Sequence, residues 1–137
     1  MTTAIRSSKG IHIALWVTQV LLGLAFASVG AMKLTQPIAT LAANMRWPGA
    51  VPAALVRFVG MAELLGGLGL ILPAATRTMA GLTPLAGAGL ATVMLLAALF
   101  HVSRGEWAAL PVNIVLGGLA AFVAWGRSTK VPLGLLP

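Results

Sequence analysis

The sequence predicts an all-α, polytopic membrane protein: a four-helix bundle with a short interfacial helix in the first extramembrane loop. The composition is 59% hydrophobic and only 8% charged, whereas about 25% of the residues of a soluble domain are charged. Four apolar runs each approach the roughly 20 residues that a helix needs to cross a bilayer. These runs cover about residues 11–31, 53–75, 78–100 and 107–126. We therefore expect one transmembrane domain, residues 1–137, and no soluble domain.

The first predicted span follows Arg6 and Lys9 and ends in small residues, as a secretory signal peptide does. Its apolar run is longer than the roughly 7–15 residues of a signal core, and three further spans follow it. We therefore predict an uncleaved first helix.

The loop between the first two spans contains apolar residues at helical spacing, namely Ile38, Leu41, Ala42 and Met45. Pro37 suits the first position of a helix, and the "WPG" sequence that follows ends the pattern. We predict a short helix that lies in the membrane interface and covers what lies beneath it. The alternative is an irregular connector.

Four spans place both termini on one side of the membrane. Basic residues on that side are Arg6, Lys9, Arg77, Arg127 and Lys130, and those on the other side are Lys33, Arg46, Arg57 and Arg104. When Lys33 and Arg57 are set aside as structural residues close to the spans, the terminal side is the more basic. The positive-inside rule then predicts that both termini are cytoplasmic.

The composition also limits the chemistry of the chain. It has no cysteine, which excludes thiolate nucleophiles, disulfide relays and Cys-ligated metal centres for this chain acting alone. A single His near one deep Glu is too little for a metal site, and none is expected. Basic residues stand singly at the ends of apolar runs, so we expect contacts with membrane lipids and none with nucleic acid.

Polar residues from every span are predicted to converge on the side of the membrane away from the termini. Glu63 lies about 15 Å into the second span at 1.5 Å per residue. The other groups in this half are Lys33, Arg57, His101 and Asn113. A carboxylate that faces lipid costs several kcal/mol, so such groups turn inward and pair with one another.

Glu63 shares a helix stripe with Gly60 and Gly67. Small residues let a second helix approach closely, so Glu63 is expected to face a neighbouring helix. Arg57 stands about 120° around the same helix and about 9 Å along it, and is a poor intrahelical partner. We expect the partner on another helix, at Lys33, His101 or Asn113. A purely structural role for the polar cluster remains the alternative.

Four short motifs in order resemble the DoxX-like family of small four-helix membrane proteins. They are "GAMKL" at 30–34, the pattern R-x-x-G-x-x-E-x-x-G-x-x-G at 57–69, "FH" at 100–101 and "PVN" at 111–113. The resemblance covers about residues 14–126. It implies a four-helix bundle of the bacterial cytoplasmic (inner) membrane and an association with redox work, including the quinone-linked thiosulfate oxidation of the related DoxD proteins.

The first functional hypothesis is therefore a membrane redox component that binds a quinone-like or other lipophilic small molecule, with no covalent cofactor. Glu63 and His101 would move protons, and Lys33, Arg57 and Asn113 would hold the substrate. Three alternatives stand beside it: a non-redox enzyme that uses Glu63 as general acid or base, a scaffold subunit, and a proton-coupled exporter. A redox partner protein or a second copy of the chain is expected as partner.

Overall fold

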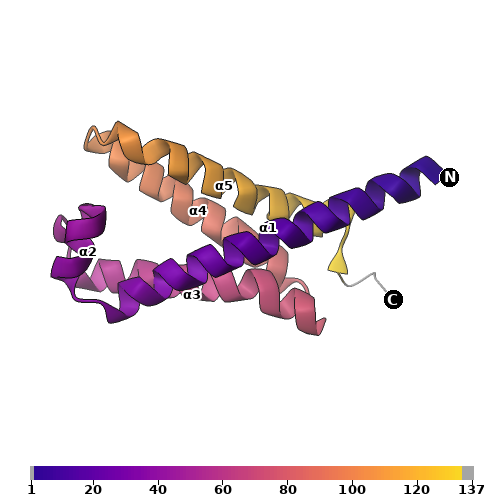
Figure 1. Ribbon diagram of the computed structural model, residues 1–137, viewed down its shortest axis with the longest axis horizontal. Coiled ribbons are helices and arrows are strands. Elements are labelled where there is room, and N and C mark those ends of the chain that lie inside the picture. The colour runs from indigo at the N-terminus through magenta and orange to yellow at the C-terminus, as the bar shows by residue number, and fades with distance from the viewer. Residues whose placement is uncertain (1, 134–137) are drawn as a thin grey trace.

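The computed structural model describes residues 2–133 and contains four long helices (Figure 1). These are α1 (Thr2–Thr35), α3 (Ala53–Thr76), α4 (Leu82–Ser103) and α5 (Leu110–Trp125). Each overlaps a segment long and apolar enough to cross a membrane: Ser8–Thr35, Ala53–Thr76, Leu82–Ser103 and Trp107–Lys130. The predicted all-α fold with four spans is confirmed.

The predicted short helix in the first loop is also confirmed. Helix α2 (Ile38–Met45) begins directly after Pro37 and buries Leu41. It is followed by the 3-10 turn η1 (Trp47–Gly49). Two further short elements flank α5: the 3-10 turn η2 (Trp107–Ala109) and the π-helical turn η3 (Gly126–Lys130).

The third span begins later than the sequence predicts, at Leu82 instead of about residue 78. Arg77 and Met79 adopt left-handed backbone conformations, with φ of 55° and 53°. Two such residues interrupt helical geometry, so residues 77–81 form the turn between α3 and α4.

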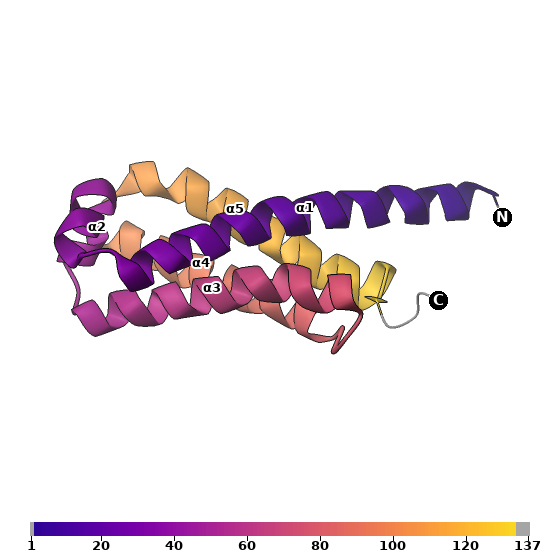
Figure 2. The same ribbon diagram turned by 60° about the horizontal axis from the view of Figure 1, so that its bottom comes forward.

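The four long helices pack as two pairs, α1 with α3 and α4 with α5. The two pairs diverge toward the end that holds α2 (Figure 1). Helix α2 lies at the end opposite both termini, and the first turns of α1 project beyond the other helices (Figure 2). The main apolar core comprises Leu22, Phe26, Leu70, Leu90, Met94, Ala120 and Val123. The divergence leaves room for a cavity between the pairs.

Glycines allow α1 and α3 to pack backbone against backbone. A Cβ atom at Gly30 would lie 2.5 Å from the backbone nitrogen of Leu64, and one at Gly67 would lie 2.6 Å from the backbone nitrogen of Ala27. The predicted stripe of Gly60, Glu63 and Gly67 is buried and faces α1, as expected.

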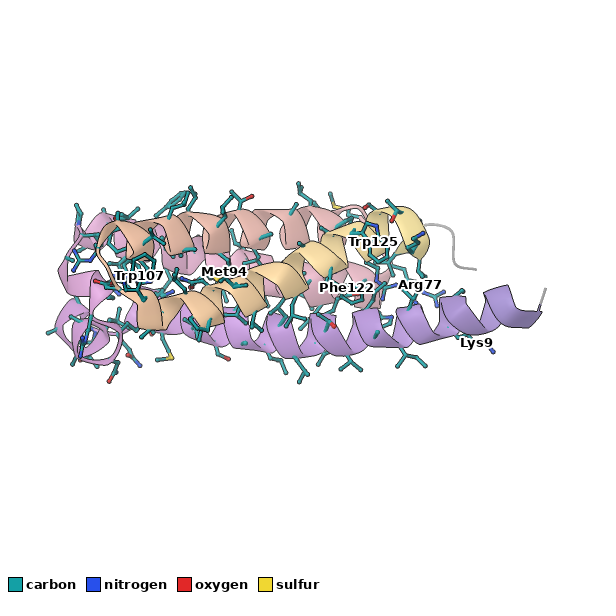
Figure 3. All side chains as sticks on the ribbon, turned by 90° about the horizontal axis from the view of Figure 1, so that it is seen from above. Lys9, Arg77, Met94, Trp107, Phe122 and Trp125 are labelled. Carbon is teal, nitrogen blue, oxygen red and sulfur yellow. The ribbon has the colours of Figure 1, made fainter. Side chains whose placement is uncertain are left out.

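Tryptophans and basic residues mark the two ends of the bundle. Trp107 lies at the end opposite Lys9, Arg77 and Trp125 (Figure 3). Such aromatic residues gather at both membrane interfaces, so this arrangement fits a bundle that spans the bilayer along its long axis.

Candidate functional site

A cavity of about 440 Å³ lies between the two helix pairs at their diverging end. Its walls come from all four long helices and from the segment around η1, and they are mostly apolar. The charged or polar side chains in its lining are Lys33, Glu63, His101 and Asn113. The structure thus brings together four of the five residues that the sequence analysis assigned to one site.

Lys33 and Glu63 form a buried ion pair that links α1 to α3. The Lys33 Nζ atom lies 2.9 Å from Oε1 and 2.7 Å from Oε2 of Glu63, and the two side chains are 7% and 3% exposed. Gly60 makes the approach possible, since a Cβ there would lie 2.7 Å from the Cβ of Lys33. The Lys33 ammonium also lies 5.3 Å from the ring centroid of Trp47, a cation–π contact that joins η1 to the pair.

Arg57 has a different environment from the one expected. Its Nη1 donates to the backbone carbonyls of Lys33, at 2.5 Å, and Gln36, at 2.8 Å. The residue four positions after Lys33 is Pro37, which has no N–H to complete the helical hydrogen bond. Arg57 supplies that missing donor and fastens α3 to the end of α1. It is absent from the cavity lining, so its geometry explains a structural role and gives no support to its predicted contact with substrate.

His101 is held by Glu106, a residue that the sequence analysis did not include in the site. The His101 Nδ1 lies 2.7 Å from Oε2 of Glu106, and Arg104 Nε donates to Oε1 at 2.6 Å. An ionised carboxylate only accepts hydrogen bonds, so Nδ1 donates and Nε2 is the nitrogen that remains for a ligand. The sequence carried one signal for this contact: Glu106 is the second of the two acidic residues and follows His101 across a tight turn.

The Glu106 carboxyl should make stability dependent on pH. The hydrogen bond from Arg104, followed by that from His101, lowers the pKa of Glu106 below its ordinary value of 4.5. A lowered pKa in the folded state stabilises it above the ordinary value, and this contribution is lost as the pH falls through the lowered pKa. We expect the unfolding temperature in detergent to fall on acidification below pH 4.5, and to fall less in Glu106→Gln. Parallel curves for the two proteins would contradict this coupling.

Asn113 presents an unpaired donor at the cavity. It lies on α5 two residues after Pro111, and its Nδ2 is buried without a hydrogen-bond partner within residues 2–133. Buried polar atoms in native proteins nearly always have a partner. An amide donor in a cavity wall therefore fits a ligand that carries a hydrogen-bond acceptor.

The cavity wall between α3 and α4 faces the hydrocarbon of the bilayer. It includes Leu55, Phe58 and Leu96, which are 46%, 71% and 60% exposed. Apolar side chains exposed within membrane-spanning helices contact lipid tails. This geometry suits a ligand that is dissolved in the membrane.

The part of the chain that the structure describes holds no group of three or more His, Cys, Asp or Glu side chains that could bind a metal ion. The polar side chains of the cavity can transfer protons, form hydrogen bonds and pair charges.

Comparison with known protein families matches the chain to the DoxX-like family over residues 17–123. The chain belongs to the DoxX-like family. Every polar residue of the cavity lies within the matched segment. No curated protein and no solved structure matches the chain.

Proposed function

We propose that this DoxX-like protein binds a quinone-like or other lipophilic small molecule in its cavity and acts as a membrane redox component or subunit. The cavity carries the proposal: it is mostly apolar, part of its wall consists of exposed apolar side chains, and it contains an unpaired amide donor. Its volume of about 440 Å³ lies within the roughly 300–1,000 Å³ of small-molecule sites.

A quinone has two carbonyl oxygens, and each takes up a proton when the ring accepts two electrons. Asn113 Nδ2 can donate a hydrogen bond to one such oxygen. His101, oriented by Glu106 through Nδ1, can hold or release a proton at Nε2. Glu63 would accept or release a proton on separation from Lys33. The electrons would come from a redox partner protein.

The ion pair supports a second candidate, a scaffold subunit. Both carboxylate oxygens of Glu63 bond to Lys33, so the pair is satisfied without a ligand. In that case the polar cluster only fixes α1 against α3, and lipid tails fill the cavity. A ligand test separates the two functions.

The protein should be purified in mild detergent, and its absorption spectrum and an organic extract analysed by mass spectrometry. We expect a stoichiometric quinone-like molecule in the parent protein and in Thr92→Ala, a control on the exposed face of α4. Asn113→Leu and His101→Phe should retain much less of it. Folded parent protein that contains only phospholipid would refute the redox proposal and favour the scaffold.

We also propose that the chain lies in the bacterial cytoplasmic membrane with both termini in the cytoplasm. The basic residues at the terminal end of the bundle support this orientation. A reporter fused after the last residue should be active only if it is a cytoplasmic reporter. Activity of a periplasmic reporter at that position would reverse the orientation and place the cavity on the cytoplasmic side.

A further inference from the structure

A second buried polar cluster lies at the end of the bundle that holds the termini, around Arg127 of η3. Arg127 is only 2% exposed. Its Nε donates to Oε1 of Gln19 at 2.6 Å, and Gln19 Nε2 donates to the carbonyl of Leu70 at 2.7 Å. The guanidinium therefore ties η3 to α1 and α3. Arg127 lies outside the cavity lining and beyond the residues that the family matches.

This buried cation has no carboxylate partner within residues 2–133. The sequence has two acidic residues, and both are engaged at the other end of the bundle: Glu63 with Lys33, and Glu106 with His101 and Arg104. A charge that is buried without a counter-charge strongly destabilises the folded state.

In the part of the chain that the structure describes, the remaining hydrogen bonds of Arg127 are to neutral groups. Its Nη1 lies 3.1 Å from Nδ1 of His12 and 3.4 Å from the carbonyl oxygen of Val131. Its Nη2 is buried and has no hydrogen-bond partner in the described part of the chain. One charged donor is thus left unused in a position where burial makes an unmade hydrogen bond costly.

His12 adds a second donor. A guanidinium has only donors, so Nδ1 of His12 must accept the Arg127 hydrogen bond. In the neutral ring the hydrogen is then on Nε2. Trp16 lies against the guanidinium, with its ring centroid 5.5 Å from Cζ of Arg127. Among the described residues, the cluster therefore offers a cation and ring donors, and no negative charge.

We propose that Arg127 and His12 bind a phosphate group through Nη2 and Nε2, respectively. The planar fork of a guanidinium matches phosphate oxygens and strengthens hydrogen bonds by its charge. Lys9, Arg77 and Trp125 lie at the same end of the bundle (Figure 3), where lipid headgroups meet the protein. The phosphate belongs to a lipid headgroup or is free in solution.

The segment that follows η3 is buried and contacts the guanidinium through Val131. Val131 and Leu133 are 7% and 8% exposed, and the bond from Arg127 to the Val131 carbonyl, at 3.4 Å, is the longest that the guanidinium makes. Phosphate binding would displace this segment and replace a neutral carbonyl by an anionic oxygen.

Titration of the delipidated protein in detergent, followed by its unfolding temperature and by native mass spectrometry, tests the site. The three additives are short-chain phosphatidylglycerol, inorganic phosphate and diacylglycerol. We expect phosphatidylglycerol to raise the unfolding temperature with a saturable dependence on concentration, and diacylglycerol to have no effect. An equal rise with inorganic phosphate identifies a free phosphate as the ligand, and a rise with the lipid alone identifies a headgroup. No rise with either phosphate compound refutes the site.

Variants separate this site from general attraction of anions to a basic surface. Arg127→Gln and His12→Phe should each weaken the binding by about tenfold or more. If Arg127→Gln fails to fold, His12→Phe still tests the site, because it retains the hydrogen bond between Arg127 and Gln19. Lys130→Gln removes an exposed cation of the same η3 turn and should change the affinity little. Equal losses in Lys130→Gln and His12→Phe would overturn the proposal.

Discussion

Glu63→Gln should unfold in detergent with a free energy of unfolding about 3–5 kcal/mol below that of the parent protein. The substitution removes the negative charge and leaves the Lys33 ammonium, 7% exposed, as a buried cation. The other acidic residue, Glu106, bonds to His101 and Arg104 and cannot take its place. Chemical or thermal unfolding followed by circular dichroism gives the difference.

The partner of Glu63 should determine the size of this loss. Removing both charges, in Lys33→Met combined with Glu63→Leu, should recover much of the stability, because no unpaired charge remains. Glu63→Asp should recover only part, since its shorter side chain keeps the charge but not the reach to Nζ. Arg46→Gln removes an exposed cation and should leave stability nearly unchanged.

The same variants distinguish the two candidate functions. If Glu63→Gln is unstable and the double variant recovers both stability and ligand binding, the ion pair has a structural role. A Glu63→Gln protein as stable as the parent but without ligand shows that the carboxylate works on the ligand. A stable Glu63→Gln protein with unchanged ligand binding would show that the pair has neither role.

Much of the fold could be predicted because it depends on local patterns. Runs of about 20 apolar residues define membrane helices regardless of their neighbours, and Pro37 with the spacing of Ile38, Leu41 and Met45 defined α2. The position of Glu63 between Gly60 and Gly67 predicted that it faces a neighbouring helix, because small residues mark helix contacts, and the structure shows that this helix is α1. The predicted start of the third span was wrong. Arg77 and Met79 adopt left-handed conformations, but neither residue type signals such a conformation in a sequence as glycine does.

The partners of the polar groups could be predicted less well, because each cation had several plausible acceptors. Lys33 and Arg57 enter the same region of the bundle. Only the three-dimensional arrangement shows that Lys33 pairs with Glu63 and that Arg57 donates to two backbone carbonyls. The missing N–H of Pro37 is the one sequence signal from which the second assignment could have been predicted. Arg127 was interpreted as an interfacial charge, because burial of a residue after the last span depends on how η3 folds back on α1.

Substitution of glycine by alanine should have opposite effects at Gly67 and Gly118. A Cβ at Gly67 would lie 2.6 Å from both the Ala27 nitrogen and the Gly23 oxygen. Both are backbone atoms, so α1 and α3 must separate, at a cost of about 1–3 kcal/mol. A Cβ at Gly118 meets no atom within 4 Å in the described structure. Alanine there should stabilise the helix by about 0.5–1 kcal/mol.

The neighbouring Gly66 provides the matched control, because it shares its helix turn and sequence context with Gly67. A Cβ at Gly66 would lie 2.6 Å from Cδ2 and 2.7 Å from Cγ of Leu90, which are side-chain atoms and can shift more easily than the backbone atoms that face Gly67. Gly66→Ala should therefore lie between the two, with a smaller loss than Gly67→Ala. Unfolding free energies of the three single variants, measured in one detergent, give the order. Equal losses of stability at Gly66 and Gly67 would show that the backbones of α1 and α3 separate as easily as a side chain moves. In that case the contact of α1 with α3 would not hold Lys33 and Glu63 in fixed positions.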